Sequence, residues 1–312
     1  MAGETSVCGV VVAYNPEQER LREAVGRVRP QVDELVVVDN GPVGLTSLGP
    51  EVTVLAQEAN VGLAEGLNRG IALARAGGHS HVLLLDQDSW PEPGMVEALL
   101  SALSGQLERG RVAAVGPRHF DPRLGKYAPF LRVRFPLSRK VSGETGAIRC
   151  DFLIGSGMLV PMPVLEEVGP MDSGLFIDNV DLDWCFRARD RGFELYGVAD
   201  ARMQHLIGDS RSTLLGGLAS VAHHSPDRLY FIMRNRVELY RRPHTPKAWI
   251  AQDLPRVLVK LVVFGLVLGP RVQNLRSMLR GLLDGIRGAS GAGPLGPATS
   301  RRHAPTYGKS AP

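Results

Sequence analysis

The first half of the chain alternates short runs of aliphatic and β-branched residues with segments of helical periodicity, and this pattern limits the fold more than any other feature. The runs occupy residues 7–13, 35–39, 52–55, 81–85 and 112–115. Strands separated by helices are typical of βαβ units, whose strands lie parallel in one sheet. We therefore predict an α/β fold with a mostly parallel sheet flanked by helices.

Helices are predicted from the spacing of apolar residues and from Pro and Gly at segment ends. Leu21, Val25 and Val28, for example, lie three or four positions apart, as one helix face requires. The predicted helices span 21–28, 60–75, 93–103, 163–168 and 181–191.

The regular alternation ends after residue 115. Gly116 and Pro117 are expected to stop the fifth strand. Residues 118–149 are irregular and rich in Arg and Pro, a pattern more typical of hairpins and loops than of α/β units. We interpret this segment as an insert.

Charge divides the chain into an acidic body and a basic end. Residues 1–240 hold 24 Lys and Arg against 30 Asp and Glu, whereas residues 241–312 hold 12 Lys and Arg against two Asp. We predict one α/β domain over 1–240 and a basic amphipathic helical extension over 241–288. Residues 289–312 are rich in Gly, Ala, Ser and Pro and are expected to be disordered.

Basic and aliphatic residues alternate in the extension, which is typical of a peripheral membrane contact and not of a nucleic-acid site. Its apolar run 261–268 is too short to span a bilayer. The extension is predicted to contact an anionic membrane surface. Two alternatives fit the same amphipathic pattern: a helical cap on the main domain, and the interface of a homodimer.

The N-terminus and the cysteines favour a cytoplasmic location. Residues 1–6 contain no basic region of the kind that opens a signal peptide. Cys8, Cys150 and Cys185 lie far apart, so the sequence predicts neither a disulfide framework nor a zinc site. With the extension on lipid, the protein would lie on the inner face of the plasma membrane.

Asp86 and Asp88 directly follow the apolar strand 81–85. Ligands of open α/β sheets gather at the carboxyl ends of the strands. Strand alternation would point both side chains the same way, where they act together on a hard cation and the diphosphate it carries. A solvated turn after a strand is the alternative.

A second acidic cluster opens the helix predicted over 181–191 and contains Asp178, Asp181 and Asp183. Helix capping and the macrodipole explain one acid at this place, but not three. A carboxylate beside a metal diphosphate site can remove the proton of an incoming hydroxyl. The cluster is therefore a candidate for the general base.

Several further motifs occur in a fixed order along the chain. They lie at residues 11–16, 36–41, 60–64, 68–70, 86–88, 155–157, 176–181, 184–187, 205–209, 225–226 and 234–235. Their order and spacing resemble those of the family 2 inverting glycosyltransferases of the GT-A fold, and within them the bacterial rhamnosyltransferases. The resemblance covers about residues 7–240.

The resemblance implies a pocket for the nucleotide of a nucleotide-sugar donor. In that pocket Ala13 and Tyr14 flank the base, and Asp39 accepts a hydrogen bond from the pyrimidine ring. Asn60 and Gly62 lie beside the donor.

The resemblance also implies a divalent metal, Mg²⁺ or Mn²⁺, at the donor diphosphate. Asp88 holds the metal, and Asp86 faces the ribose or the sugar. His205 is a further contact to the metal or the diphosphate, with a structural role in closing a loop as its alternative. Arg234 is expected to pair with the phosphates, although a surface salt bridge is the default role of an arginine.

Asp181 aligns with the general base of the family. The acid that usually precedes this base is replaced here by Val180, which leaves the role of Asp183 open. Asp178, Asp183 and Trp184 are expected to support the base.

The implied reaction is transfer of L-rhamnose from dTDP-rhamnose, with inversion, to a hydroxyl of a glycan or polyprenyl-linked acceptor of the cell envelope. A non-catalytic module that binds nucleotide sugars or glycans is one alternative, against which the intact acid set argues. A sugar nucleotidyltransferase is another, but its Gly-rich signature is replaced by Tyr14-Asn15-Pro16. No GxGxxG follows the first strand, so a Rossmann dehydrogenase is disfavoured.

Overall fold

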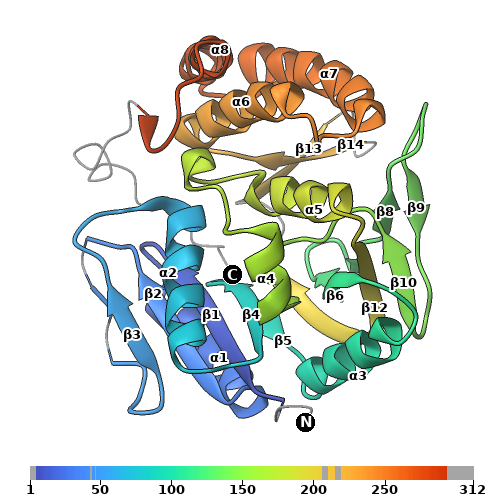
Figure 1. The fold of residues 1–312 in the computed structure, drawn as a ribbon. Coiled ribbons are helices and arrows are strands. Elements are labelled where there is room, and N and C mark those ends of the chain that lie inside the picture. Colours follow the sequence, from blue (N-terminus) through green and yellow to red (C-terminus); the bar gives the residue numbers. More distant parts are fainter. Residues whose placement is uncertain (1–4, 43, 46, 206–209, 215–218, 294–312) are drawn as a thin grey trace.

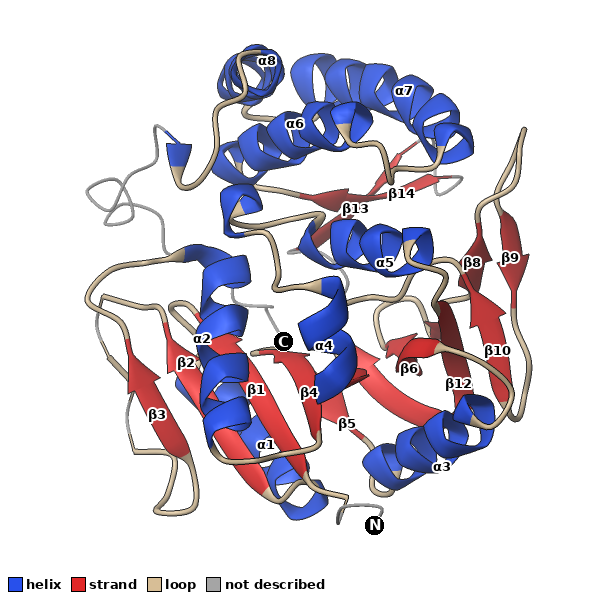
Figure 2. Ribbon diagram, viewed as in Figure 1, coloured by secondary structure: helices blue, strands red, loops and turns tan. Residues whose placement is uncertain are grey.

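The structure is a computed structural model, and it describes residues 5–293 except 43, 46, 206–209 and 215–218. Part of the expected disordered tail, from residue 294 onward, lies outside the described residues. The centre of the molecule is a ten-stranded sheet (Figures 1 and 2). Its main path runs in the order β10-β12-β6-β11-β4-β1-β2-β3.

The first four strands of the chain are mutually parallel and confirm the βαβ prediction. They are β1 (Val7–Ala13), β2 (Glu34–Asp39), β3 (Thr53–Ala56) and β4 (His81–Asp86). The side chains of β1 alternate between the two faces of the sheet, because successive residues of a strand point to opposite sides. Val10 and Val12 belong to one apolar core cluster, whereas Val11 and Ala13 belong to the other.

Helices cover both faces and fill these two core clusters (Figure 1). The first cluster takes its buried side chains from the sheet and from α2 (Gly62–Ala76), α4 (Met162–Val168) and α5 (Val180–Asp190). The second takes them from the sheet and from α1 (Gln18–Val28) and α3 (Met95–Leu107). The predicted helices therefore exist, with ends that differ by a few residues.

The second half of the sheet mixes strand directions. β6 (Val112–Asp121) runs parallel to β12 (Glu194–His205), while β10 (Ala147–Cys150) and β11 (Met158–Pro161) are antiparallel to their neighbours. The prediction that Gly116 and Pro117 stop the strand is wrong. Both residues continue β6 and face Gly197 and Val198 of β12, so pairing along the whole strand outweighs the local turn signal.

Short hairpins flank the sheet where the insert was predicted. β7 (Lys126–Tyr127) returns on β6, and β8 (Phe130–Arg132) pairs with β9 (Arg139–Val141). A separate ribbon of β13 (Ser210–Leu214) and β14 (Ala219–His223) lies under the C-terminal helices (Figure 1).

The C-terminal helices form a layer above the carboxyl ends of β1 and β4 (Figure 1). They are α6 (Pro226–Arg241), α7 (Lys247–Val262), the π-helical turn η4 (Val263–Val267) and α8 (Arg271–Ile286). A Cβ atom on Gly281 would lie 2.3 Å from the carbonyl oxygen of Tyr230, and one on Gly285 would lie 2.8 Å from that of Arg234. These glycines thus let α8 pack directly on the backbone of α6. Among the described residues, no helix is both long enough and apolar enough to cross a bilayer.

Candidate active site

The site is assembled where β4 ends. Asp86 is the last residue of β4, and Asp88 precedes the short strand β5 (Ser89–Pro91). β5 pairs antiparallel with the end of β12, and this pairing places His205 opposite Ser89. Ligand atoms of Asp86, Asp88 and His205 all lie within 4.8 Å of one another. His205 Nε2 is 3.8 Å from Asp86 Oδ2, and His205 Nδ1 is 3.8 Å from Asp88 Oδ1.

These three side chains fit a divalent metal ion. They offer two carboxylates and one imidazole at a mutual spacing that one ion can bridge. Carboxylates suit Mg²⁺ and Mn²⁺, and the added imidazole favours a transition metal over Mg²⁺.

A chain of hydroxyl groups fixes the orientation of His205. Its Nδ1 is 2.9 Å from the Ser89 hydroxyl, which is 2.6 Å from the Ser156 hydroxyl. The Ser156 oxygen also accepts the backbone N–H of Asp86 at 2.9 Å. When Nδ1 carries the ring proton and donates to Ser89, the lone pair of Nε2 is free to bind a cation. Ser89 and Ser156 therefore link the imidazole to the acid beside it.

Replacing Ser89 with Ala is expected to weaken Mn²⁺ binding by about 10–100-fold, the usual effect of losing the partner of a metal-binding histidine. Calorimetric titration of the protein with MnCl₂, without donor, measures this directly. Ser101→Ala on the exposed side of α3 is the matched control. Equal Mn²⁺ affinity in both variants would show that Ser89 does not orient His205.

Neighbouring charges and burial shift the titration of this cluster. Although 38% of the Asp86 side chain is exposed, the surrounding protein withholds solvent and raises the pKa of Asp86 to about 6. Asp88 and Asp181 raise this pKa too, whereas His205 and Arg228 lower it. A bound cation would stabilise the charged form of these crowded acids.

Asp181 lies in the first turn of α5 and is held by two backbone amides. Its Oδ2 accepts the N–H of Gly155 at 2.9 Å, and its Oδ1 accepts the N–H of Leu182 at 2.8 Å. Burial raises the pKa of Asp181 and nearby Asp178 raises it further, while the two amides lower it. Each carboxylate oxygen keeps a second lone pair that can take a proton.

The adjacent residues Gly155 and Ser156 join the two acidic groups. Gly155 binds the carboxylate of Asp181, and Ser156 binds the backbone of Asp86. The base candidate and the metal candidate are thereby fixed to the same short segment.

The loop that leads into Asp181 is strained. Phe176, Asp178 and Asn179 have φ angles of 64°, 65° and 64°, a region that residues other than Gly rarely adopt. Such residues each cost about 1–3 kcal/mol and persist only where the surroundings hold them. Backbone strain of this kind is concentrated at functional sites in proteins.

Arg234 and Asn235 of α6 hold this loop. The Asn235 amide donates to the carbonyl oxygens of Leu175, Ile177 and Asp178. The Arg234 guanidinium donates to the carbonyl oxygens of Gly174, Leu175 and Gly291. This corrects the expected contact of Arg234 with the phosphates, because its side chain is 1% exposed and carbonyl groups occupy its donors.

Arg228 lies on the same helix as Arg234, and its side chain brings a positive charge to the acids. Its Nε and Nη2 lie 3.2 and 3.1 Å from Asp178. Its positive charge also lowers the pKa of Asp86. Arg228 was not among the sequence candidates, because only the fold brings α6 to this place.

Asp183 and Trp184 lie in the interior, where they support α5. Asp183 is fully buried and accepts Arg187 at 2.9 Å, Arg242 at 2.6 Å and His244 at 2.8 Å. Despite its burial, these partners hold the pKa of Asp183 below its usual value. Trp184 donates its indole N–H to the carbonyl of Gly169.

The residues expected to bind the donor gather beside the end of β1. The Tyr14 N–H donates to the side chain of Gln87, the middle residue between the two acids, at 2.6 Å. Ala13 is buried, and Asp39 accepts the N–H of Gly41 at 3.0 Å. The first strand and the acid motif are thus joined directly.

Asn60 and Gly62 form the turn that opens α2. The Asn60 side chain accepts the N–H of Gly62, whose carbonyl accepts the amide of buried Asn40. Gly62 has a φ of 85°, and a Cβ atom there would lie 2.5 Å from the Phe176 ring. Only glycine lets this turn approach the strained loop so closely.

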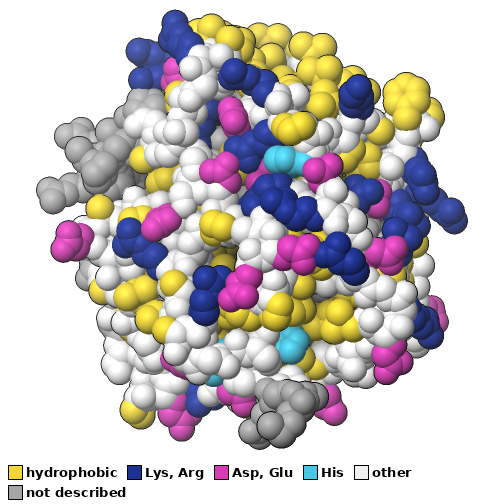
Figure 3. Space-filling view, in the orientation of Figure 1, with side chains coloured by type: hydrophobic (Ala, Val, Ile, Leu, Met, Phe, Trp, Pro, Cys, Tyr) yellow, Lys and Arg dark blue, Asp and Glu magenta, His cyan; other side chains and the backbone are white. Residues whose placement is uncertain are grey.

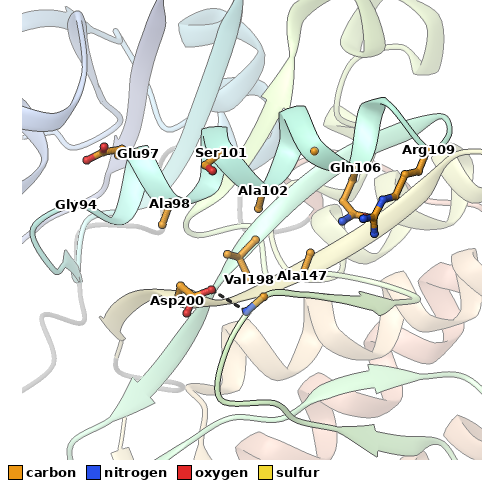
Figure 4. A pocket seen from close by; sticks show the side chains of 12 residues that line it. Gly94, Glu97, Ala98, Ser101, Ala102, Gln106, Arg109, Ala147, Val198 and Asp200 are labelled. Carbon is orange, nitrogen blue, oxygen red and sulfur yellow. Dashed lines mark hydrogen bonds between the residues drawn. The ribbon is translucent and has the colours of Figure 1, made fainter.

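Two other features have the geometry of a binding site but not the chemistry: a possible metal cluster and a surface groove. Cys8, Glu34 and His79 meet metal-ligand spacing, yet burial raises the pKa of Cys8 to about 12, and His79 is bonded to Ser6 and Glu34. The groove along α3 in Figure 4 presents scattered side chains that do not converge. Of its two acids, Glu97 and Asp200, the latter accepts the backbone N–H of Gly146 at 2.7 Å.

Comparison with known proteins agrees with this geometry. Residues 8–168 match the family described as Glycosyl transferase family 2. The chain is 28% identical to the dTDP-rhamnosyl transferase RfbF of Shigella flexneri over 297 residues, which cover 93% of this chain and 98% of that protein.

Solved structures share the fold. GalNAc-T7 with UDP, GalNAc and Mn²⁺ superposes with a TM-score of 0.55 at 15% identity, over 92% of this chain and 57% of that one. TarS 1–349 of S. aureus gives 0.55 at 14% identity, over 90% and 81%. These likenesses confirm the predicted GT-A fold, and the chain spans little more than half of GalNAc-T7. Because the family match covers more than half of the sequence, this chain belongs to glycosyl transferase family 2.

Proposed function

We propose that this protein is an inverting, metal-dependent glycosyltransferase that transfers L-rhamnose from dTDP-rhamnose to a hydroxyl group of a cell-envelope glycan or polyprenyl-linked acceptor. The observation that carries the proposal is the joint attachment of Asp181 and Asp86 to the segment Gly155-Ser156. It supports a reaction in which Asp181 receives a proton while the group around Asp86 holds the donor. The likeness to RfbF of Shigella flexneri supports the donor.

Asp181 acts as the general base in this proposal. It removes the proton of the acceptor hydroxyl, whose oxygen attacks the anomeric carbon on the side opposite the nucleotide, and the configuration inverts once. A raised pKa makes this carboxylate a stronger base than an exposed aspartate.

Asp88, His205 and Asp86 would hold the divalent ion, Mn²⁺ or Mg²⁺. When bound, the ion supplies positive charge to the departing nucleoside diphosphate. Ser89 keeps His205 in the orientation that this binding needs. Ala13, Tyr14, Asp39, Asn60 and Gly62 would enclose the nucleoside.

A panel of nucleotide sugars tests the proposed donor without knowledge of the acceptor. With Mn²⁺ present, we expect dTDP-rhamnose to be hydrolysed slowly, with kcat/KM at least about tenfold above that of its competitors. dTDP-rhamnose and dTDP-glucose differ only in the sugar, so comparing them measures recognition of the sugar. dTDP-glucose and UDP-glucose differ only in the nucleoside, so comparing them measures recognition of the nucleoside. Preference for a UDP-hexose would overturn the donor assignment.

The same panel, with a sugar phosphate and a nucleoside triphosphate added as a further assay, separates the two rival functions. A binding module would bind a nucleotide sugar and release neither sugar nor nucleoside diphosphate. A nucleotidyltransferase would form a nucleotide sugar from a sugar phosphate and a nucleoside triphosphate.

A further inference from the structure

Two exposed apolar rows lie on the C-terminal layer, one along α7 and η4 and the other along α8. On α7 and η4, Leu254, Leu258, Val262 and Leu266 recur every four residues, and each is between 50% and 65% exposed. This spacing places them on one helix face. Large exposed apolar patches on a soluble surface mark sites of interaction with other molecules.

The row on α8 is bordered by arginines. Its apolar members are Val272, Leu279, Leu283 and Ile286, which are between 46% and 81% exposed. Along one side of this row lie the exposed residues Arg276, Arg280 and Arg287. Arg280 and Arg287 approach the same carboxylate, Asp284, at 3.7 Å each, so positive charge remains in excess. In Figure 3, yellow side chains gather along the upper edge, and dark blue ones lie beside them at the upper left.

The tip of the β8–β9 hairpin extends this surface. Gln252 of α7 donates to the carbonyl of Arg134 at 2.6 Å and accepts the N–H of Ser138 at 3.0 Å. Between these two contacts, Phe135 and Leu137 are 74% and 76% exposed. The hairpin tip thus also carries exposed aromatic and aliphatic side chains, and hydrogen bonds join it to α7.

We propose that this surface, the outer faces of α7 and α8 with the hairpin tip, seats the protein on an anionic lipid bilayer. The apolar rows enter the boundary between headgroups and acyl chains, and the bordering arginines bind lipid phosphates. Charge complementarity favours lipid over a second copy of the chain, because two such faces would bring like charges together. The surface would bring a lipid-linked acceptor to the enzyme, a consequence that rests on the proposed function. Binding itself does not.

Sedimentation with vesicles tests the proposal in the absence of donor, so its outcome is independent of the transfer reaction. We expect the full-length protein to bind phosphatidylglycerol vesicles at low salt, at least about tenfold more strongly than phosphatidylcholine vesicles. Leu258→Asp with Val262→Asp should lower binding at least about tenfold. Arg276→Gln should lower it about fivefold at low salt and less at high salt.

Two variants at the end of α3 and directly after it, at the opposite end of the molecule (Figure 1), are the matched controls. Leu107→Asp changes a side chain that is 47% exposed, and Arg109→Gln changes an exposed arginine. Both should bind vesicles as the unaltered protein does, and circular dichroism checks the folding of all variants. Equal binding of Leu258→Asp with Val262→Asp and of Leu107→Asp would overturn the proposal. So would a dimer in analytical ultracentrifugation that Leu258→Asp dissociates, without vesicle binding.

Discussion

Replacing Asp181 with Asn is expected to reduce kcat by about 10²–10⁴-fold, the usual contribution of a general base, while donor affinity stays unchanged. Asn keeps the size of Asp, and its carbonyl oxygen can still accept one of the two backbone amides, that of Gly155 or that of Leu182, but it cannot take a proton at neutral pH. Single-turnover kinetics of transfer and calorimetric titration with dTDP measure the two quantities separately.

Asp183→Asn is the matched control, two residues further along α5. Asp183 is fully buried against Arg187, Arg242 and His244, so its loss should lower the free energy of unfolding by about 3–5 kcal/mol. The folded fraction should retain its kcat. A folded Asp183→Asn protein without activity, beside an active Asp181→Asn protein, would move the base to Asp183.

The pH profile gives a second readout of the same base. Asp181 must be deprotonated to act, so kcat falls as pH drops through its pKa. Because burial raises that pKa, the acidic limb should lie above the usual range of an aspartate. The limb should vanish from the residual activity of Asp181→Asn.

Replacing Asp88 with Ala is expected to lower metal-dependent turnover by roughly 10³-fold and to abolish the stimulation of donor binding by Mn²⁺. In the proposed mechanism, the loss of one of three candidate ligands would remove the positive charge that stabilises the leaving diphosphate, worth several kcal/mol in the transition state. Transfer assays over a Mn²⁺ titration, with and without chelator, measure the effect.

Asp190→Ala, at the exposed end of α5, is the control for Asp88→Ala and should behave as the unaltered protein does. Turnover of Asp88→Ala at saturating donor that equals the control would exclude Asp88 as a metal ligand. If chelator has no effect on the unaltered protein, the reaction needs no metal, and Asp88 has another role.

The sequence predicts the elements whose signal is local. Residues 81–86 are recognisable because a run of aliphatic residues fits a strand buried on both faces, and the acids at its end fit the ligand edge of a sheet. The strand over Glu194–His205 escaped prediction. Its exposed and buried residues alternate irregularly, and its register shifts twice against β6.

The supporting contacts of the site could not be predicted, because they join residues far apart in the chain. Ser89 reaches His205 across 116 positions, and Asn235 reaches Leu175 across 60. A serine after an acid motif and an Arg-Asn pair within a helix carry no local sign of such partners. The resemblance implies that Arg234 faces the phosphates, whereas the fold buries its side chain.

The contact between α8 and α6 also bears on when the site forms during synthesis. Gly281 and Gly285 pack on the backbone of α6, and the carbonyl of Gly291 accepts a hydrogen bond from Arg234. These residues leave the ribosome after every acid of the site has been made. A nascent chain that already carries Asp181 therefore still lacks part of the support for its loop. Transfer activity should thus appear only after α8 and Gly291 have been synthesised.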